Sequence, residues 1–149
     1  MKKSPFVLIT KGLLDVMFYI GAAIFIGIPY LFRLAGKYYN IFDKFYIPFC
    51  IIYMIAGIFA LAIIWNLRLM LRTVIREDPF VKENVNSLRR MGRCAFIIAA
   101  IMTLKFIFVI TPATIVLVIV FIIAGLFSLV LSQVFDKAVT YKQENDLTI

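Results

Sequence analysis

Two ionisable residues lie within long apolar stretches, where a charge is costly and is therefore a candidate for function. Asp15 comes about one helical turn into the first stretch, and Lys105 lies within the third. An embedded carboxylate could couple the movement of protons or cations, which is the chemistry of a small transporter. We expect Asp15 at the cytoplasmic edge, within reach of Lys11 one turn earlier. We expect Lys105 near the outer edge, where its stem can reach the interface. The two should therefore not pair, and we predict no transport role for Asp15.

A row of arginines follows the second long apolar stretch. Arg68, Arg72 and Arg76 recur every four residues, so they lie on one face of a helix that continues out of that stretch. Asp78 and Pro79 come next. Aspartate is a favoured N-cap, and proline is a favoured first residue of a helix. The sequence therefore predicts a tight turn here, followed at once by a new helix.

The resulting helical hairpin, expected over residues 68–93, would carry an apolar face with Phe80 at its tip. An apolar strip in water is costly unless it is covered, and aromatic and arginine side chains dominate the energetics of interfaces. We therefore predict that the hairpin binds a cytosolic protein. The candidate partner-binding residues are Arg68, Arg72, Arg76, Phe80, Leu88, Arg89 and Arg90. The alternative is that the positive charges contact only anionic lipid headgroups and set the topology.

The residue types from which most enzyme sites are built are missing or scattered. The chain has no histidine, which removes the commonest general base and metal ligand. Its two cysteines, Cys50 and Cys94, are expected near opposite membrane faces, and a buried thiol usually behaves as a small apolar group. No glycine-rich phosphate loop or metal-ligand spacing is present in the sequence. We predict that the protein is not an enzyme and uses no cofactor or metal.

The elements that position these residues are helices that cross a membrane. The 149 residues are 64% hydrophobic and 16% charged, with a mean hydropathy of +1.01, whereas a soluble domain carries about 25% charged residues. Lipid offers no partners for bare backbone groups, so each crossing must be helical. We predict an all-α protein, a four-helix transmembrane bundle in one domain over residues 1–149. The crossings are expected at about 13–34, 45–67, 94–110 and 114–134.

The basic residues predict the orientation, because lysine and arginine favour the cytoplasmic side of a membrane. Most of the 16 lie in the N-terminal arm, the central segment and the C-terminal tail, which share one side if the chain crosses four times. Arg33, Lys37, Lys44 and Lys105 belong to the other side. We expect both termini to be cytoplasmic, in the bacterial cytoplasmic membrane. Topology then accounts for the net charge of +8, and no direct contact with nucleic acid is expected.

Aromatic and small residues indicate how the helices would sit and pack. Tyr38, Tyr39 and Tyr46 are expected at the outer membrane interface, which favours aromatic rings with polar groups. Small residues let helices approach closely in lipid. The candidates are Gly21 and Ala22, Ala56 and Ala60, Ala95 and Ala99, and Ala124 and Ser128. They could serve packing within the chain or between copies, so a homo-oligomer stays open.

The segment Asp78–Gly92 reads Asp-Pro-Phe-Val-Lys-Glu-Asn-Val-Asn-Ser-Leu-Arg-Arg-Met-Gly. Its Pro-Phe, Glu-Asn and Leu-Arg-Arg groups resemble the signature of a family of small bacterial four-span membrane proteins, catalogued as a domain of unknown function. The resemblance extends over nearly the whole chain in length and span layout. Members of such families are often encoded beside a helix-turn-helix regulator of the Cro type. The resemblance therefore implies a membrane partner that holds or releases a transcription regulator, and it carries over no catalytic residue.

Together these observations predict a regulatory membrane protein that docks a cytosolic partner and also contacts membrane lipids, including anionic headgroups. Two alternatives remain open. One is a small transporter or channel subunit that uses Asp15, and the other is a structural membrane protein without a ligand. A polar stripe through the interior of the bundle would favour transport.

Overall fold

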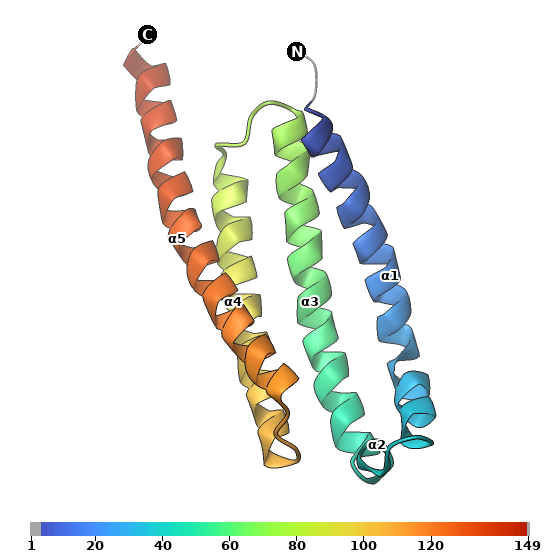
Figure 1. Ribbon diagram of the computed structural model, residues 1–149. Helices are drawn as coiled ribbons and strands as arrows, with labels where there is room; N and C mark the ends of the chain where they lie inside the picture. Colours follow the sequence, from blue (N-terminus) through green and yellow to red (C-terminus); the bar gives the residue numbers. More distant parts are fainter. Residues whose placement is uncertain (1–3, 149) are drawn as a thin grey trace.

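The computed structural model describes residues 4–148, and nearly all of these residues are helical (Figure 1). Four long helices run up and down in chain order, each packed against the long helices next to it in the sequence. A short helix follows the first, and a single turn of 3₁₀ helix follows the third. The elements are α1 (Pro5–Gly36), α2 (Asn40–Lys44), α3 (Tyr46–Ile75), α4 (Lys82–Leu104), η1 (Lys105–Ile107) and α5 (Pro112–Thr148). The all-α prediction is confirmed.

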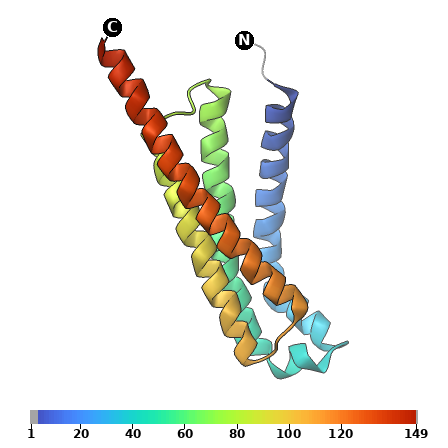
Figure 2. The same cartoon turned by 60° about the vertical axis from the view of Figure 1, so that its left-hand side comes forward.

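Figures 1 and 2 show the start of α1, the end of α3, the start of α4 and the end of α5 at one end of the molecule. We call this the loop end, after the segment 76–81 that joins α3 to α4. The opposite end holds α2 and the connection between η1 and α5. Helix α5 extends past the start of α4, beyond the rest of the loop end (Figure 2).

Helix α4 is the centre of the structure, because it packs against both α3 and α5. Its buried side chains include Val85, Ala95 and Ile98. Ile98 and Met102 join Ile52 and Ala56 of α3 in an apolar core cluster. Helices α1 and α5 lie at the two edges of the row and leave many large apolar side chains exposed, as expected for helices that face lipid.

Helices α4 and α5 approach each other closely at two glycines. A Cβ atom at Gly92 would lie 3.2 Å from the carbonyl oxygen of Gly125 and 3.0 Å from the side chain of Leu129. Of the small residues predicted to mediate packing, Ala95 and Ala99 are buried, as is Ala56 on α3, whereas Ala124 is exposed. The contact on α5 is made by its neighbour Gly125, which the sequence analysis did not select.

Within the described residues, three helices are long and apolar enough to cross a membrane: α1, α3 and α5. Four crossings were expected from the sequence. The third of them, residues 94–110, is not among these three helices. Its helix begins at Lys82 and carries Arg89, Arg90 and Arg93 in its first half. Its apolar second half ends at Leu104, where the chain tightens into η1. Helix α4 therefore carries too much charge, and its apolar part is too short, for the helix to have the composition of a membrane span.

The predicted start of the helix after the arginines is also wrong. Helix α4 begins at Lys82, with Val81 at the cap position, instead of at Pro79. The chain turns first at Glu77, whose φ is +62°, and the amide of Asp78 donates to the carbonyl of Thr73. The side-chain amide of Asn84 donates to Thr73 Oγ1 at 2.7 Å and to the Pro79 carbonyl at 2.6 Å. These bonds hold the connection against the end of α3, so α4 begins three residues later than predicted, at Lys82.

The tail after the fourth expected crossing, for which the sequence predicted no secondary structure, is helical. Helix α5 continues without interruption from Pro112 to Thr148. Its second half packs beside the start of α4. The segment 68–93 is therefore accompanied by a third helix, which covers much of the face that was expected to project alone.

Candidate binding surfaces at the loop end

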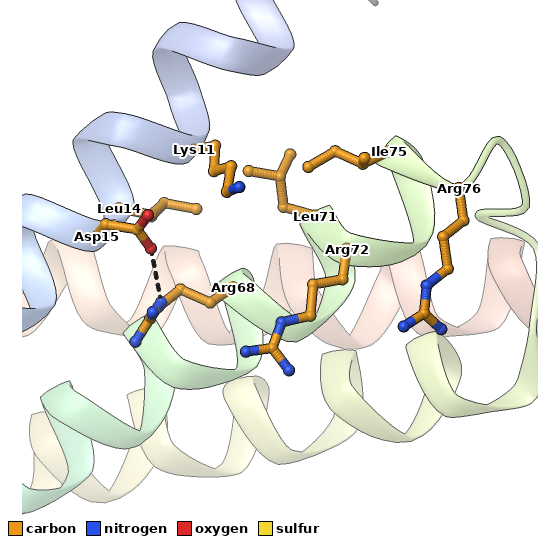
Figure 3. Close-up of a pocket in the computed structure, with 8 residues that line it drawn as sticks. All are labelled: Lys11, Leu14, Asp15, Arg68, Leu71, Arg72, Ile75 and Arg76. Carbon is orange, nitrogen blue, oxygen red and sulfur yellow. Dashed lines mark hydrogen bonds and ion pairs between the residues drawn. The ribbon is translucent and has the colours of Figure 1, made fainter.

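A cleft of about 420 Å³ opens between α1 and α3 at the loop end. Figure 3 shows the side chains that surround it, three of them arginines in a row along α3. They are Lys11, Leu14, Asp15, Arg68, Leu71, Arg72, Ile75 and Arg76. The predicted four-residue spacing of the arginines therefore does place them along one cleft, together with residues of α1.

An ion pair inside this cleft joins the two helices. Arg68 Nε donates to Asp15 Oδ1 at 2.9 Å (Figure 3). The guanidinium carbon of Arg68 also lies 5.0 Å from the ring centre of Phe18 and 5.2 Å from that of Trp65. Asp15 thus pairs with an arginine of α3, and not with Lys11 of its own helix as the sequence suggested. An arginine that stacks on two rings while it binds a carboxylate is held in place.

The other three cations of the cleft have no such partner. Among the described residues, no ion pair joins Lys11, Arg72 or Arg76 to a carboxylate. Arg72 lies 5.9 Å from the ring centre of Trp65, and Arg76 is exposed. The cleft therefore carries an excess of positive charge.

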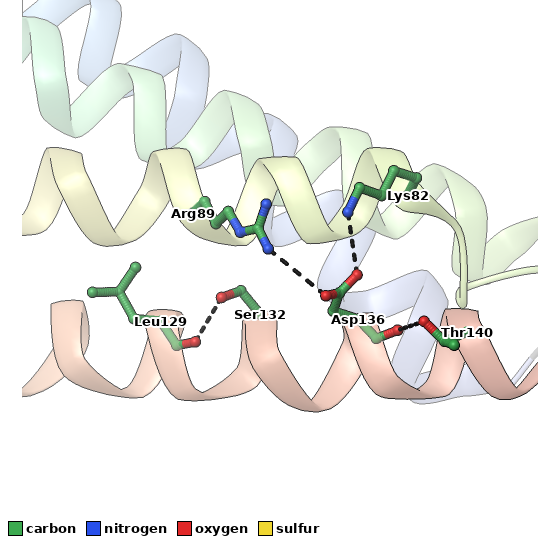
Figure 4. Close-up of polar contacts among 6 residues, drawn as sticks. All are labelled: Lys82, Arg89, Leu129, Ser132, Asp136 and Thr140. Atoms are coloured by element: carbon green, nitrogen blue, oxygen red, sulfur yellow. Dashed lines mark hydrogen bonds and ion pairs between the residues drawn. The ribbon is translucent and has the colours of Figure 1, made fainter.

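The contact between α4 and α5 at the same end is different, because its charges are matched (Figure 4). Asp136 of α5 accepts a hydrogen bond from Lys82 Nζ at 3.2 Å, and its other oxygen lies 3.9 Å from Arg89 Nη2. Further along, Lys142 of α5 forms an ion pair with Asp78 of the connection. These pairs join α5 to the start of α4.

A shallow groove of about 320 Å³ lies between the start of α4 and the end of α5. Phe80 lines it with its side chain 44% exposed, and its ring centre lies 5.4 Å from that of Phe135. The full lining is Phe80, Val81, Lys82, Glu83, Val139, Lys142, Gln143 and Asp146. Since two of its cations are already paired, the groove offers apolar surface within a largely neutralised rim.

The structure separates the residues that were predicted to bind one partner. Arg68, Arg72 and Arg76 line the α1–α3 cleft, whereas Phe80 lines the α4–α5 groove. Leu88 is only 4% exposed and packs in the interior, so it cannot contact a partner in this arrangement.

The last two residues of the predicted set lie on α4. Arg89 is bound to Asp136, and Arg90 is exposed and donates to Ser87 Oγ at 3.3 Å. The residues that sequence reasoning missed are those of α5, above all Asp136. Its signal was a lone carboxylate placed after a long apolar run.

Lys105 lies at the opposite end, and it points inward. It is 7% exposed and donates to Thr114 Oγ1 at 2.9 Å, with the ring centres of Phe49 and Tyr53 both 5.6 Å from Nζ. The sequence analysis expected its stem to reach the membrane interface. The turn at η1 instead directs it toward the first turn of α5, where a hydroxyl and two ring faces surround the ammonium group.

The buried polar side chains are satisfied in separate local groups. Asn66 donates to the carbonyl of Ala62 in its own helix, and Ser132 does the same with Leu129. Between these groups and Lys105 lies the apolar core cluster. Within residues 4–148, no three potential metal-ligating side chains come together, and both cysteines are free thiols. This arrangement is unlike the continuous polar stripe that a transporter would need.

Comparison with known proteins identifies the family of this chain. Residues 30–149 match the family model DUF2975, described as a protein of unknown function, so the chain belongs to this family. The predicted membership of a family of unknown function is thereby confirmed. No curated protein matches the chain, and no solved structure matches it either.

Proposed function

We propose that this member of the DUF2975 family is a non-enzymatic, regulatory protein of the bacterial cytoplasmic membrane. It crosses the membrane four times, keeps its loop end in the cytoplasm, and recruits a cytosolic regulatory protein at the α4–α5 groove. The observation that carries this proposal is the exposed ring of Phe80 in an apolar groove whose two lysines are already paired.

The directions in which α3 and α5 run support a fourth crossing. Helix α3 ends at the loop end and α5 begins at the opposite end (Figure 1). If both cross the bilayer, the chain between them must return across it, and α4 is that chain. It can do so despite its charges because α3 and α5 flank it. Its arginines lie in the first half, where their stems can reach the headgroups.

The position of the bilayer is indicated by aromatic residues on α1 and α3. Tyr46 begins α3, and Trp65 lies further along it. At about 1.5 Å per residue these two are about 28 Å apart, which matches a hydrocarbon core of about 30 Å. Tyr19, whose neighbour Phe18 packs on Trp65, is exposed, and so is Tyr39 in the connection between α1 and α2. Rings with polar groups favour both interfaces, so the cleft and the groove would lie in the cytoplasmic headgroup region or beyond it.

The length of α5 supports an exposed groove. Its 37 residues would extend about 55 Å, far more than one crossing requires. The part beyond the bilayer carries Val139, which is buried against the groove, and Lys142, which holds the connection. An apolar groove in water gains free energy when a partner covers it. We propose that an apolar side chain of a cytosolic helix-turn-helix regulator inserts beside Phe80, with the exposed Arg90 attracting acidic groups.

Transport remains the weaker function. The ion pair with Arg68 fixes Asp15, and the apolar cluster of α3 and α4 separates it from Lys105. No row of polar side chains among the described residues leads from one to the other. A purified protein in liposomes that moved cations, and lost that activity on Asp15→Asn, would establish the transport function in place of docking.

Site-specific cross-linking tests the docking proposal. A photoreactive amino acid at position 80 should cross-link to one cytosolic protein in intact cells. The matched control is position 141, because Tyr141 is an aromatic residue of the same end that is more exposed than Phe80 and lines none of the pockets described. Cross-links of equal yield and identity from both positions, or none from position 80, would contradict docking at the groove.

The topology has its own measurement. In a variant without native cysteines, we expect an impermeant thiol reagent to label a cysteine at Tyr39 in intact cells, but not one at Asn86. Both side chains are exposed, so labelling reports the side of the membrane. Labelling at 86 and not at 39 would reverse the orientation. Neighbouring Ser87 is unsuitable for this purpose because it is buried.

A further inference from the structure

We infer that the α1–α3 cleft is a binding site for the phosphate group of an anionic phospholipid. This inference goes beyond the proposed function, because it concerns a different surface and a different ligand. Its first support is charge. Lys11, Arg72 and Arg76 all line one cleft, and the only carboxylate among the lining residues, Asp15, is already bound to Arg68.

Three like charges around one cleft repel each other, and that repulsion falls when an anion enters between them. Arginine binds phosphate oxygens through paired N–H donors, and lysine binds them as a point charge. The ion pair of Asp15 with Arg68 joins the two helices at one end of the row of lining residues (Figure 3). It ties together the two helices that carry the free cations, which lowers the cost of bringing those cations together around a ligand.

The depth of the cleft favours a lipid over a soluble phosphate. Trp65 lies beside it, within 5.9 Å of the guanidinium groups of both Arg68 and Arg72, and its side chain is partly exposed. A tryptophan in this position indicates the membrane interface, which is where phospholipid phosphates lie. Basic pockets between helices on the cytoplasmic side suit anionic headgroups.

The apolar lining points to the same class of ligand. Leu14, Leu71 and Ile75 line the cleft together with the cations. A free phosphate ion would gain nothing from these side chains, whereas the glycerol and the first carbons of an acyl chain would bury apolar surface against them. One ligand, an anionic phospholipid, therefore accounts for both the charged and the apolar parts of the lining.

The chain's single tryptophan provides the measurement. Bromine atoms on an acyl chain quench tryptophan fluorescence at short range, so quenching of Trp65 reports the lipid beside the cleft. The protein is placed in bilayers that contain equal parts of phosphatidylcholine and phosphatidylglycerol, with bromine on one lipid or the other. We expect clearly stronger quenching by brominated phosphatidylglycerol. Equal quenching by the two lipids would overturn the inference.

Variants assign the preference to the cleft. Lys11→Ala with Arg72→Ala removes two of its cations and should lower the preference for phosphatidylglycerol about thirtyfold, since each cation near the headgroups contributes about 1 kcal/mol. Lys11→Arg with Arg72→Lys keeps both charges and should retain the preference, which controls for a defect in folding. Lys37→Ala with Lys137→Ala removes the same charge from exposed positions elsewhere and should also retain it. An unchanged preference in the first variant would overturn the inference.

A last arm distinguishes the source of the phosphate. Inorganic phosphate is added to the same bilayers, with a chloride salt at equal ionic strength as the control. If the site takes a lipid, the preference for phosphatidylglycerol should respond equally to the two salts. If inorganic phosphate alone abolishes it, the cleft is a site for a soluble phosphate and the lipid assignment is wrong. None of these variants alters Phe80, so the outcome is independent of the docking proposal.

Discussion

The α1–α3 contact and the α4–α5 contact lie at the same end of the molecule and use the same residue types in opposite ways. Between α4 and α5, Asp136 forms ion pairs with Lys82 and Arg89, and Asp78 of the connection forms one with Lys142. Between α1 and α3, one carboxylate pairs with one arginine, and the other three cations have no carboxylate partner among the described residues. Between α4 and α5, the carboxylates therefore pair with cations of the chain itself. Between α1 and α3, three cations stay available to a ligand from outside the chain.

The difference also appears in how closely the helices approach. Gly92 and Gly125 bring the backbones of α4 and α5 together, so their side chains meet and match. Helices α1 and α3 also approach closely at Gly21 and Gly57, where a Cβ atom would lie 3.2 Å from Leu61 and 3.0 Å from Phe25, but toward the loop end a Cβ atom at Gly12 would meet nothing within 4 Å. Where two helices pack tightly, their charged side chains pair with each other. Where the helices separate, charged side chains remain exposed and can bind a ligand. Each prediction below changes one side of this comparison.

The largest effect is expected from Gly92→Val. The added side chain would meet Leu129 and the carbonyl of Gly125, and overpacking of this kind costs about 1–3 kcal/mol. Unfolding by titration with sodium dodecyl sulfate, followed by circular dichroism, measures the loss. Gly12→Val is the matched control and should cost much less, because that position is open. If the two variants lost equal stability, the close approach of α4 and α5 would not matter for the fold.

Asp15→Asn should have an intermediate effect on stability, about 1 kcal/mol, because it breaks the partly buried pair with Arg68. It should also free a fourth cation in the cleft and so strengthen the preference of Trp65 for phosphatidylglycerol. The opposite signs on stability and on lipid preference make this variant informative. A weaker lipid preference in Asp15→Asn would mean that the carboxylate shapes the site more than it neutralises it.

Asp136→Asn should have the smallest effect, about 0.5 kcal/mol, because its ion pairs are exposed to solvent. It should leave the lipid preference unchanged. High salt should reduce the stability difference between this variant and the natural protein, since salt screens exposed pairs. A large change in lipid preference here would contradict the separation of the two surfaces.

Several features could be predicted from the sequence because they depend on composition and local spacing. The long apolar runs predict helices, and α1, α3 and α5 fulfil that prediction. The four-residue spacing of Arg68, Arg72 and Arg76 predicts one helical face, which the structure contains within α3. These predictions succeed because an α-helix places residues by their separation along the chain alone.

Other features depend on a neighbouring helix and could not be predicted from spacing. The sequence correctly places Leu88 on an apolar face of its helix. The side chain is buried because α5 packs against α4, which the sequence pattern does not reveal. The start of α4 depends on Asn84, which bonds back to Thr73 and Pro79 and overrides the local signal of Asp78 and Pro79. Such long-range contacts need the fold before they can be found.

The composition of α4 has a consequence for how the protein is made. If α4 crosses as proposed, it is the one crossing that is too charged to enter a bilayer unaided. Its apolar surface is matched to α5, which emerges from the ribosome only after it. We therefore expect the two helices to enter the membrane as a pair, once the long apolar α5 has been synthesised. Until then, α4 would wait at the cytoplasmic surface, held there by the same arginines that later lie at the membrane edge.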